Sequence, residues 1–325
     1  MDEFQSIAAL FRPLTNGAPE ALGLLDDAAV IPSRPGFDLV ITKDAMVSGV
    51  HFLPDDPPGL VAQKLLRVNL SDLAAKAADP YAYFLAVAWP KGWDEAERAA
   101  FAAGLALDQA RYGLVLLGGD TVSTPGPLTL SVTVLGWAPA GAMVKRAGAQ
   151  VGDLLLVSGT IGDGALGLRA AQGEDLGLDA EATAYLADRY RLPQPRNALT
   201  PALRHYAAAA ADVSDGLIAD AGHVAATSGV GLRIDLDRLP LSAPTALWLA
   251  RQPDHAAALK MLATSGDDYE VVCTVRPHDA QAAIALAAQS GVIMTPIGLV
   301  DAAPGVRALL DGRAVPIARS GWSHL

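Results

Sequence analysis

Short apolar runs alternate with long alanine-rich runs along this chain, and the alternation restricts it to the α/β class of folds. The apolar runs have the length of strands, and the alanine-rich runs have the length and composition of helices. In the first half, strands are predicted over residues 38–42, 81–90, 114–117 and 128–137, and helices over 4–14, 60–78 and from about 93. In the second half, strands are predicted over residues 153–159, 231–236, 269–275 and 292–300.

A stretch rich in glycine and alanine, residues 138–152, separates the two halves and has no helical or strand periodicity. Connectors of this kind usually join domains. We therefore expect two domains, residues 1–138 and residues 139–325, and 325 residues are enough for two hydrophobic cores.

Composition excludes several classes of function. The net charge of −11 opposes nucleic acid binding, which needs clustered lysine and arginine. A single cysteine, Cys273, excludes an internal disulfide and a cysteine-based metal site, and its apolar neighbours predict a buried, inert thiol. No apolar run has the length of a membrane span, and the N-terminus opens with acids, so we expect a soluble, cytoplasmic protein.

Carboxylates gather where strands end or helices begin. Five segments share this property: Asp26–Ala28, Thr42–Asp44, Asn69–Asp72, Gly119–Thr121 and Asp212–Gly216. Two carboxylates about 4 Å apart repel by about 4 kcal/mol at an effective dielectric near 20, so they converge only around cations or protons. Magnesium prefers oxygen ligands and suits such a cluster. Any single aspartate has the alternative of an ordinary turn or helix cap.

Two of these segments predict particular geometry. The spacing of three places Asn69 and Asp72 on one helical face, which Lys76 continues, so both side chains are expected to point into one cleft. In the segment Asp212–Gly216, Ser214 has the chemistry of a helix N-cap. The free amides of that helix start would bind a phosphate, or the segment is simply a capped helix; the sequence leaves both readings open.

Common nucleotide-binding motifs are missing, since the chain has neither a P-loop nor the catalytic loop of protein kinases. A Gly-x-Gly-x-x-Gly pattern occurs at Gly162, Gly164 and Gly167 after a predicted strand. The acid expected at the end of a second strand is absent, because the region about 20 residues further on has a helical pattern. The glycines are therefore predicted to pack a helix against a strand.

Taken in order, the acidic segments and their neighbours resemble the thiamine-monophosphate kinase family, in the superfamily of aminoimidazole ribonucleotide synthetase, selenophosphate synthetase and the hydrogenase maturation factor HypE. The resemblance covers nearly the whole chain. Its blocks are LLDDAAVIP, ITKDAMVSGVHF, VNLSDLAAKAADP, LLGGDTVS, VKRAGAQVGD, LPQPR, ADVSDGL, SGDDYEV and GWSHL. The segment Gly49–Phe52 and the closing Gly-Trp-x-His favour the kinase over its relatives.

This resemblance implies ATP-dependent phosphorylation of thiamine monophosphate to thiamine diphosphate, with several Mg²⁺ ions and ATP bound in a cleft. It implies an aminoimidazole-ribonucleotide-synthetase-like fold and a homodimer joined through the N-terminal sheets. The first domain would bind metal and ATP and form the dimer, and the second α/β domain would complete the ATP and substrate site. Neither nucleic acid nor membrane is an expected partner.

The resemblance also assigns residues. Metal-binding positions fall on Asp27, Thr42, Lys43, Asp44, Asp72, Asp120, Asp212 and Asp215, of which Asp44, Asp72 and Asp120 carry the catalytic ions. ATP-contacting positions fall on Gly119, Asp120, Arg146 and Ser214. Substrate-contacting positions fall on His51, Asp267 and Trp322.

Three departures from the family pattern stand out. Lys43 replaces a frequent threonine, and because an ammonium cannot ligate Mg²⁺, only its carbonyl could serve there. Asp267 replaces a frequent glutamate, which shortens its reach. Leu25 replaces the second glycine of the N-terminal block, which predicts a stiffer loop before Asp27.

Two alternatives remain at this level. One is another ATP-dependent enzyme of the superfamily, similar to aminoimidazole ribonucleotide synthetase; selenophosphate synthetase is disfavoured because its N-terminal reactive cysteine or selenocysteine is missing. The other is a non-catalytic protein that binds Mg-ATP, which the intact set of aspartates opposes.

Overall fold

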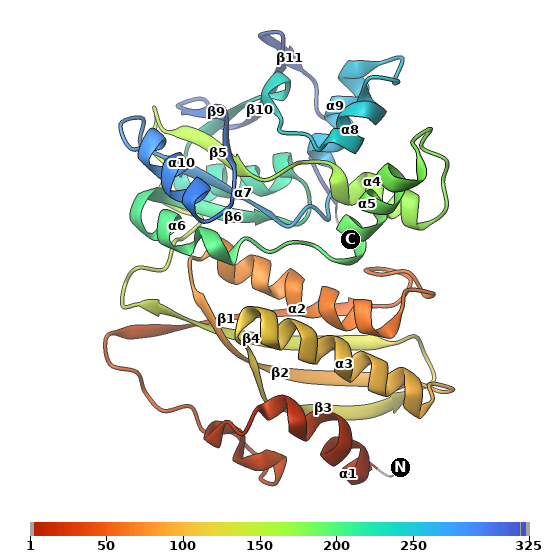
Figure 1. Ribbon diagram of the computed structural model, residues 1–325. Helices are drawn as coiled ribbons and strands as arrows, with labels where there is room; N and C mark the ends of the chain where they lie inside the picture. The colour runs from red at the N-terminus through yellow and green to blue at the C-terminus, as the bar shows by residue number, and fades with distance from the viewer. Residues whose placement is uncertain (1–2, 319, 323–325) are drawn as a thin grey trace. The chain divides into compact units, whose positions relative to one another are not determined.

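The structure is a computed structural model that describes residues 3–318 and 320–322 of the chain (Figure 1). It divides into two compact units. The first unit comprises Met1–Leu73 and Ala78–Gly141, and the second comprises Ala74–Ala77 and Ala142–Leu325. The segment Ala74–Ala77 thus belongs with the second unit, although its first two residues end a helix of the first.

A four-stranded sheet in the order β1-β4-β2-β3 forms the first unit. Its strands are β1 Phe37–Val47, β2 Asp79–Pro90, β3 Val115–Thr124 and β4 Thr129–Pro139. Strand β4 pairs antiparallel with β1 and β2, and β2 pairs parallel with β3. Figure 1 shows the helices α2 (Pro58–Ala75) and α3 (Glu95–Tyr112) along one face of this sheet. All four strands predicted for this half are confirmed.

The ends of α3 follow ordinary capping chemistry. Asp94 and Glu97 form a reciprocal capping box at its start, and Gly113 ends it with a left-handed φ of 71°. At the N-terminus, the helix predicted over residues 4–14 is helical throughout, but it is not one continuous α-helix. The chain instead makes the short α1 (Glu3–Ser6), a π-turn over Ile7–Phe11 and a 3₁₀ turn over Arg12–Thr15, where Pro13 cannot supply an amide to continue an α-helix.

The other face of this sheet is covered only at one end. Ala21, in the 3₁₀ segment Pro19–Leu24, packs there against Ala82, Leu117 and Leu135. Beyond that cover the face stays open, because Ile41 is 57% exposed and Val122 is 51% exposed. The first unit therefore presents apolar sheet surface to the outside.

A seven-stranded sheet in the order β11-β10-β7-β9-β5-β8-β6 forms the second unit. The strands are β5 Leu154–Ser158, β6 Ala207–Val213, β7 Gly231–Asp235, β8 Glu270–Val275, β9 Met294–Asp301, β10 Gly305–Leu310 and β11 Arg313–Val315. The pair β7 and β10 is parallel, and the other neighbours are antiparallel. The four strands predicted for this half are confirmed.

Helices cover both faces of the second sheet. They are α4 Asp163–Ala171, α5 Ala180–Arg191, α6 Thr200–Tyr206, α7 Leu217–Ser228, α8 Ala243–Leu249, α9 His255–Thr264 and α10 Ala280–Gln289, with 3₁₀ turns at Asn197–Leu199 and Leu236–Arg238. The apolar side chains of α7 belong to one core cluster, and those of α6 and α10 belong to another. Strand β8 contributes to both clusters and is buried throughout, as a central strand should be.

The glycine-rich turn at the start of α4 is a packing device, as the sequence predicted. A Cβ on Gly167 would lie 2.2 Å from the carbonyl oxygen of Leu186 in α5, and one on Gly164 would lie 2.3 Å from that of Asp267. Only glycine permits these approaches.

The expectation of an inert thiol is also supported. Cys273 is buried in β8, and burial raises the pKa of its thiol to about 12. Over the described residues, no helix is both long enough and apolar enough to cross a bilayer.

A buried ion pair joins helices α2 and α3 of the first unit. The Arg67 guanidinium in α2 donates to both carboxylate oxygens of Asp108 in α3, at 2.7 and 2.9 Å, and both residues are at most 3% exposed. We expect Arg67→Met to lower the free energy of unfolding by about 3–5 kcal/mol, because Asp108 would remain buried without its partner. The control is Arg67→Met with Asp108→Leu, which should recover most of the loss in urea unfolding; equal destabilisation of both variants would contradict this account.

Candidate functional site

One face of the first sheet brings three predicted residues together. Thr42 and Asp44 lie on the side of β1 that faces α2, and Asp72 lies near the C-terminal end of that helix. The Thr42 hydroxyl donates to Asp72 Oδ2 at 2.5 Å. This hydroxyl and these carboxylates are oxygen donors of the kind that Mg²⁺ prefers, so the residues fit a magnesium site in their chemistry.

Asp120 lies on the opposite face of that sheet. In the strand register, Asp120 is level with Ala86, Ser131 and Ala45, whereas Asp44 is level with Gly119. Neighbouring residues in register share a face, so the sheet separates Asp120 from Asp44 within this unit. Gly119 makes the approach of β3 to β2 possible, because a Cβ there would lie 1.8 Å from the carbonyl oxygen of Leu85.

Three other predicted residues of the first unit lie apart from these. Asp27 is exposed on the loop before β1, where its amide donates to the side chain of Asp26. The Lys43 ammonium donates to Ser131 Oγ at 2.9 Å on the open face. His51 accepts the Val47 amide on Nδ1 at 3.0 Å, which makes Nε2 the protonated nitrogen of a neutral ring.

The prediction that Asn69 and Asp72 share a cleft is wrong. Asn69 is fully buried, and its side-chain amide donates back to the Leu65 carbonyl one turn earlier in α2. Lys76 does not continue that face either, because its ammonium donates to the Ala210 carbonyl in the second unit's own strand β6. Helical spacing placed these residues correctly along the helix, but it could not show which face the core would cover.

In the second unit, three segments distant in sequence meet at the end of β6. The Asp267 amide donates to the Ser214 carbonyl at 2.9 Å, and the Tyr269 amide donates to the Val213 carbonyl at 2.8 Å. The Trp322 amide donates to the Asp215 carbonyl at 2.9 Å. Four predicted site residues, Ser214, Asp215, Asp267 and Trp322, are thus neighbours along a shared hydrogen-bonded backbone.

The predicted residues of this region differ in their solvent exposure. Asp212 is 5% exposed at the end of β6, whereas the Trp322 side chain is 55% exposed. Arg146 is exposed in the segment before β5, where its carbonyl accepts the Ser228 hydroxyl. The final residues of the closing sequence block, 323–325, lie outside the described residues.

The open question about the Asp212–Gly216 segment has a definite answer. The helix α7 begins at Leu217 with Gly216 as its N-cap, so Ser214 is not the cap. The amides of Ser214, Asp215 and Gly216 all donate to Asp220 Oδ2, at 3.0, 3.0 and 3.2 Å. A carboxylate of the chain itself therefore fills the amide cradle that would otherwise bind a phosphate.

Two buried acids in this region were not singled out from the sequence, Asp220 and Asp268. Burial and then the charge of Asp215 raise the pKa of Asp220 to about 7, against the opposing effect of its three amide donors. Burial likewise raises the pKa of Asp268 well above its ordinary value. An acid in the first turn of a helix is a common N-terminal signal that could have identified Asp220. Asp268 follows Asp267 directly, and nothing in the sequence distinguishes their roles.

Within the described residues, no three side chains of histidine, cysteine, aspartate or glutamate are arranged to hold a metal ion. Among the predicted metal ligands, Thr42 and Asp72 are in direct contact through their hydrogen bond. The residues thus fit magnesium by the chemistry of their donors, and the number and grouping of the ions stay predictions.

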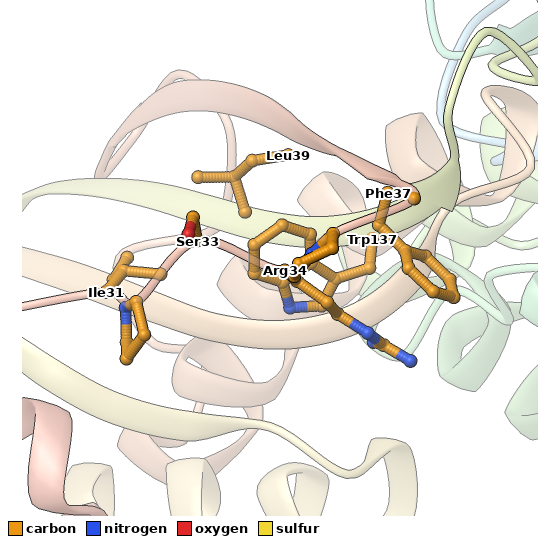
Figure 2. A pocket seen from close by; sticks show the side chains of 9 residues that line it. Ile31, Ser33, Arg34, Phe37, Leu39 and Trp137 are labelled. Carbon is orange, nitrogen blue, oxygen red and sulfur yellow. The ribbon is translucent and has the colours of Figure 1, made fainter.

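A pocket of about 390 Å³ lies elsewhere in the first unit, against Trp137 (Figure 2). The segment Ile31–Phe37 and Leu39 complete its wall, and the Arg34 guanidinium lies 3.7 Å from the centre of the Phe37 ring. None of the predicted site residues lines this pocket.

Two family models match this chain. The AIR synthase related protein, N-terminal domain, matches residues 25–138, and the AIR synthase related protein, C-terminal domain, matches residues 150–311. A thiamine-monophosphate kinase of Caulobacter vibrioides is 56% identical over 99% of this chain and 90% of its own length. A thiamine-monophosphate kinase of Salmonella typhimurium is 40% identical over 99% of this chain and 98% of its own length.

Solved structures are similar as well. The crystal structure of thiamine-monophosphate kinase from Stenotrophomonas maltophilia has a TM-score of 0.85 and 38% identity, covering 97% of this chain and 98% of its own. A structure described as AaThiL complexed with AMPPCP and TMP has a TM-score of 0.79 and 28% identity, covering 90% of this chain and 89% of its own. The hydrogenase maturation protein HypE, at 18% identity and a TM-score of 0.76, shares the fold.

The cradle filled by Asp220 leads to a stability prediction. Asp220→Ala should lower the free energy of unfolding by about 3 kcal/mol, because it leaves three amides at the start of α7 without their acceptor. Asp254→Ala is the matched control, since Asp254 caps α9 at the surface through one amide and its loss should cost about 1 kcal/mol. Urea unfolding measures both, and equal losses would show that the cradle adds nothing to an ordinary cap.

Proposed function

Because this chain belongs to the thiamine-monophosphate kinase family, we propose that it transfers the γ-phosphoryl group of ATP to thiamine monophosphate, giving ADP and thiamine diphosphate. The observation that carries the proposal is the 56% identity to a thiamine-monophosphate kinase over 99% of the chain. A related structure holds AMPPCP, an ATP analogue, together with TMP, which supports ATP and the thiamine ester as the two substrates. No specific observation favours an aminoimidazole ribonucleotide synthetase activity or a non-catalytic role.

The chemistry of the acceptor explains why acids dominate the proposed site. A phosphate monoester already carries an anionic oxygen near neutral pH, so attack on the γ-phosphorus does not require a general base. The obstacle is the repulsion between two anionic esters that must approach in line. Several Mg²⁺ ions, when bound, would offset that repulsion and neutralise the charge that develops on the transferred group.

The metal-binding roles are part of the proposal. In the first unit we assign Asp27, Asp44, Asp72 and Asp120, with the Thr42 hydroxyl and the Lys43 carbonyl. In the second unit we assign Asp212 and Asp215. The placement of Asp44 and Asp120 on opposite faces of one sheet supports more than one ion for the first unit.

ATP and the thiamine ester are assigned to the remaining residues. Arg146, Ser214 and the Gly119 backbone would contact ATP, the arginine through the bidentate geometry that guanidinium groups form with phosphates. Because Asp220 occupies the amide of Ser214, Ser214 would contribute its hydroxyl. His51 would donate Nε2–H to the substrate, Asp267 would meet its positive charge, and the exposed Trp322 ring would stack on a cationic or aromatic ring of thiamine.

A second element of the proposal is a homodimer formed through the sheets of the first units. The open face supports it, because Ile41 and Val122 leave apolar surface uncovered on a sheet whose other face carries two helices. A cytoplasmic location is proposed in keeping with this metabolic role.

The test of function is the detection of thiamine diphosphate by mass spectrometry after incubation with Mg-ATP and thiamine monophosphate. We expect product and an equal amount of ADP, loss of both on adding EDTA, and recovery on adding excess Mg²⁺. Asp44→Ala should lower kcat at saturating Mg²⁺ by at least about a hundredfold, since a metal-bridged phosphate loses a ligand.

Asp38→Ala is the matched control for that variant. Asp38 lies six residues earlier on β1, where its carboxylate accepts the Gly141 amide at 2.8 Å, so near wild-type turnover is expected. Near wild-type turnover in Asp44→Ala would exclude the metal role of Asp44. Absence of thiamine diphosphate with the wild-type protein would exclude the function.

The dimer is tested by Ile41→Glu, which places a charge on the open face of the first sheet. We expect sedimentation equilibrium to show a dimer for the wild type and a monomer for this variant, because a buried unpaired carboxylate disfavours association. Leu107→Glu is the control: Leu107 is 63% exposed on α3, on the sheet's other side, and its variant should remain dimeric. A wild-type monomer, or a dimer insensitive to Ile41→Glu, would refute the proposed interface.

A further inference from the structure

Asp268 occupies an unusual place for a carboxylate, the N-terminus of α4. Its Oδ2 accepts the Gly162 amide at 2.8 Å and its Oδ1 accepts the Gly164 amide at 2.9 Å. The residue is 1% exposed, so solvent does not compete for these bonds. The carboxylate thus fills the position at which a helix N-terminus binds an external phosphate in nucleotide-binding folds.

The residues on either side of Asp268 have backbone conformations that residues other than glycine rarely adopt. Asp267 has a φ of 70° and Tyr269 has a φ of 51°, both in the left-handed region. Such residues persist only where surrounding contacts hold the backbone, and they occur mainly at functional sites. Asp267 is also the residue assigned to the thiamine ester.

Contacts on two sides hold this loop. On one side, the amides of Asp267 and Tyr269 donate to the carbonyls of Ser214 and Val213. On the other side, α4 approaches so closely that a Cβ on Gly164 would lie 2.3 Å from the Asp267 carbonyl oxygen. The side chain of Asp268 bonds the loop to the start of α4 on this second side.

We propose that Asp268 is a positioning residue for recognition of the thiamine ester: its bonds to the start of α4 fix the left-handed backbone at Asp267 and so set the direction of the Asp267 carboxylate. The identity of the ligand rests on the proposed function, whereas the anchoring of the loop does not. Asp268 itself is too deeply buried to contact substrate, so it acts through Asp267.

The chemistry of the anchor requires two acceptors. Both side-chain oxygens of aspartate can accept an amide hydrogen, whereas asparagine offers one oxygen and a donor NH₂ group that would oppose the other amide. Asp268→Asn therefore removes one anchor with almost no change in volume. The loop should lose its fixed conformation while the core around it stays packed.

The kinetic test compares single and double variants. Asp268→Asn should raise the KM for thiamine monophosphate about tenfold, as loss of an outer-shell orienting contact commonly does, and leave the KM for ATP within twofold. The double variant Asp267→Asn with Asp268→Asn should be no worse than Asp267→Asn alone, because Asp268 acts only through Asp267. The proposal would be overturned if the two substitutions multiplied each other's effect on the KM for thiamine monophosphate. Equal rises in the KM values for both substrates in Asp268→Asn would overturn it as well.

Asp153→Asn serves as the matched control. Asp153 is an equally buried acid, 2% exposed, that accepts the Gln150 amide and pairs with Arg276 before β5, away from the loop. It should not change the KM for thiamine monophosphate. A rise equal to that of Asp268→Asn would show general loosening of the unit and would overturn the proposal.

A replacement variant and a hydrogen-exchange measurement test the anchoring role of Asp268 further. If Asp268→Asn does not fold, Asp268→Ala replaces it, since it removes both acceptors without adding a donor group or volume, and the same selective rise in KM is expected. Hydrogen exchange in the absence of substrate should quicken at residues 266–269 in the variant and stay unchanged in α10. This exchange result tests the anchor even if the wild type fails to phosphorylate thiamine monophosphate, and unchanged exchange at 266–269 would refute it.

Discussion

Backbone amides that lose contact with water need an acceptor, and this requirement shapes the part of the second unit where predicted site residues meet. Two inward-facing carboxylates meet it. Asp220 takes the three amides that precede α7, and Asp268 takes two amides at the start of α4. The turns that carry Asp215 and Asp267 are therefore held in place by two acidic side chains of the chain itself. This gives the outward-facing acids a fixed backbone from which to act, whether or not a phosphate is bound.

In the first unit, the alternation of side chains along strands sets the arrangement. Thr42 and Asp44 point toward α2, where Asp72 accepts the Thr42 hydroxyl, while Asp120 points to the open face. Because a sheet separates its two faces, Asp44 and Asp120 do not lie together in this unit, although both fall on metal-binding positions of the same family pattern. The open face also carries Ile41 and Val122, so one surface of the unit combines an acid proposed to bind metal with apolar area proposed to bind a second copy of the chain.

Some of the site followed from local patterns and some did not. The glycines at 162, 164 and 167 were correctly read as packing residues, because the acid that a dinucleotide site needs was missing from the sequence. Ser214 had the chemistry of an N-cap, yet the helix begins three residues later, since Asp220 captures the amides of the turn. Asn69 had the right helical spacing, yet it is buried and bonded to Leu65. In both cases the partner lies within six residues along the chain, but the burial of Asn69 and Asp220, which makes these bonds decisive, comes from tertiary packing.

The sequence by itself determined the α/β class, the eight strands it predicted and the family, because these depend on periodicity and on motifs that are contiguous in the chain. Only the tertiary structure decided which acids face inward and which face outward. Asp267 and Asp268 show the physical reason: two identical neighbouring side chains take opposite roles once a helix N-terminus lies within hydrogen-bonding distance of one of them. That distance depends on how α4 packs against the loop, and no property of the two residues encodes it.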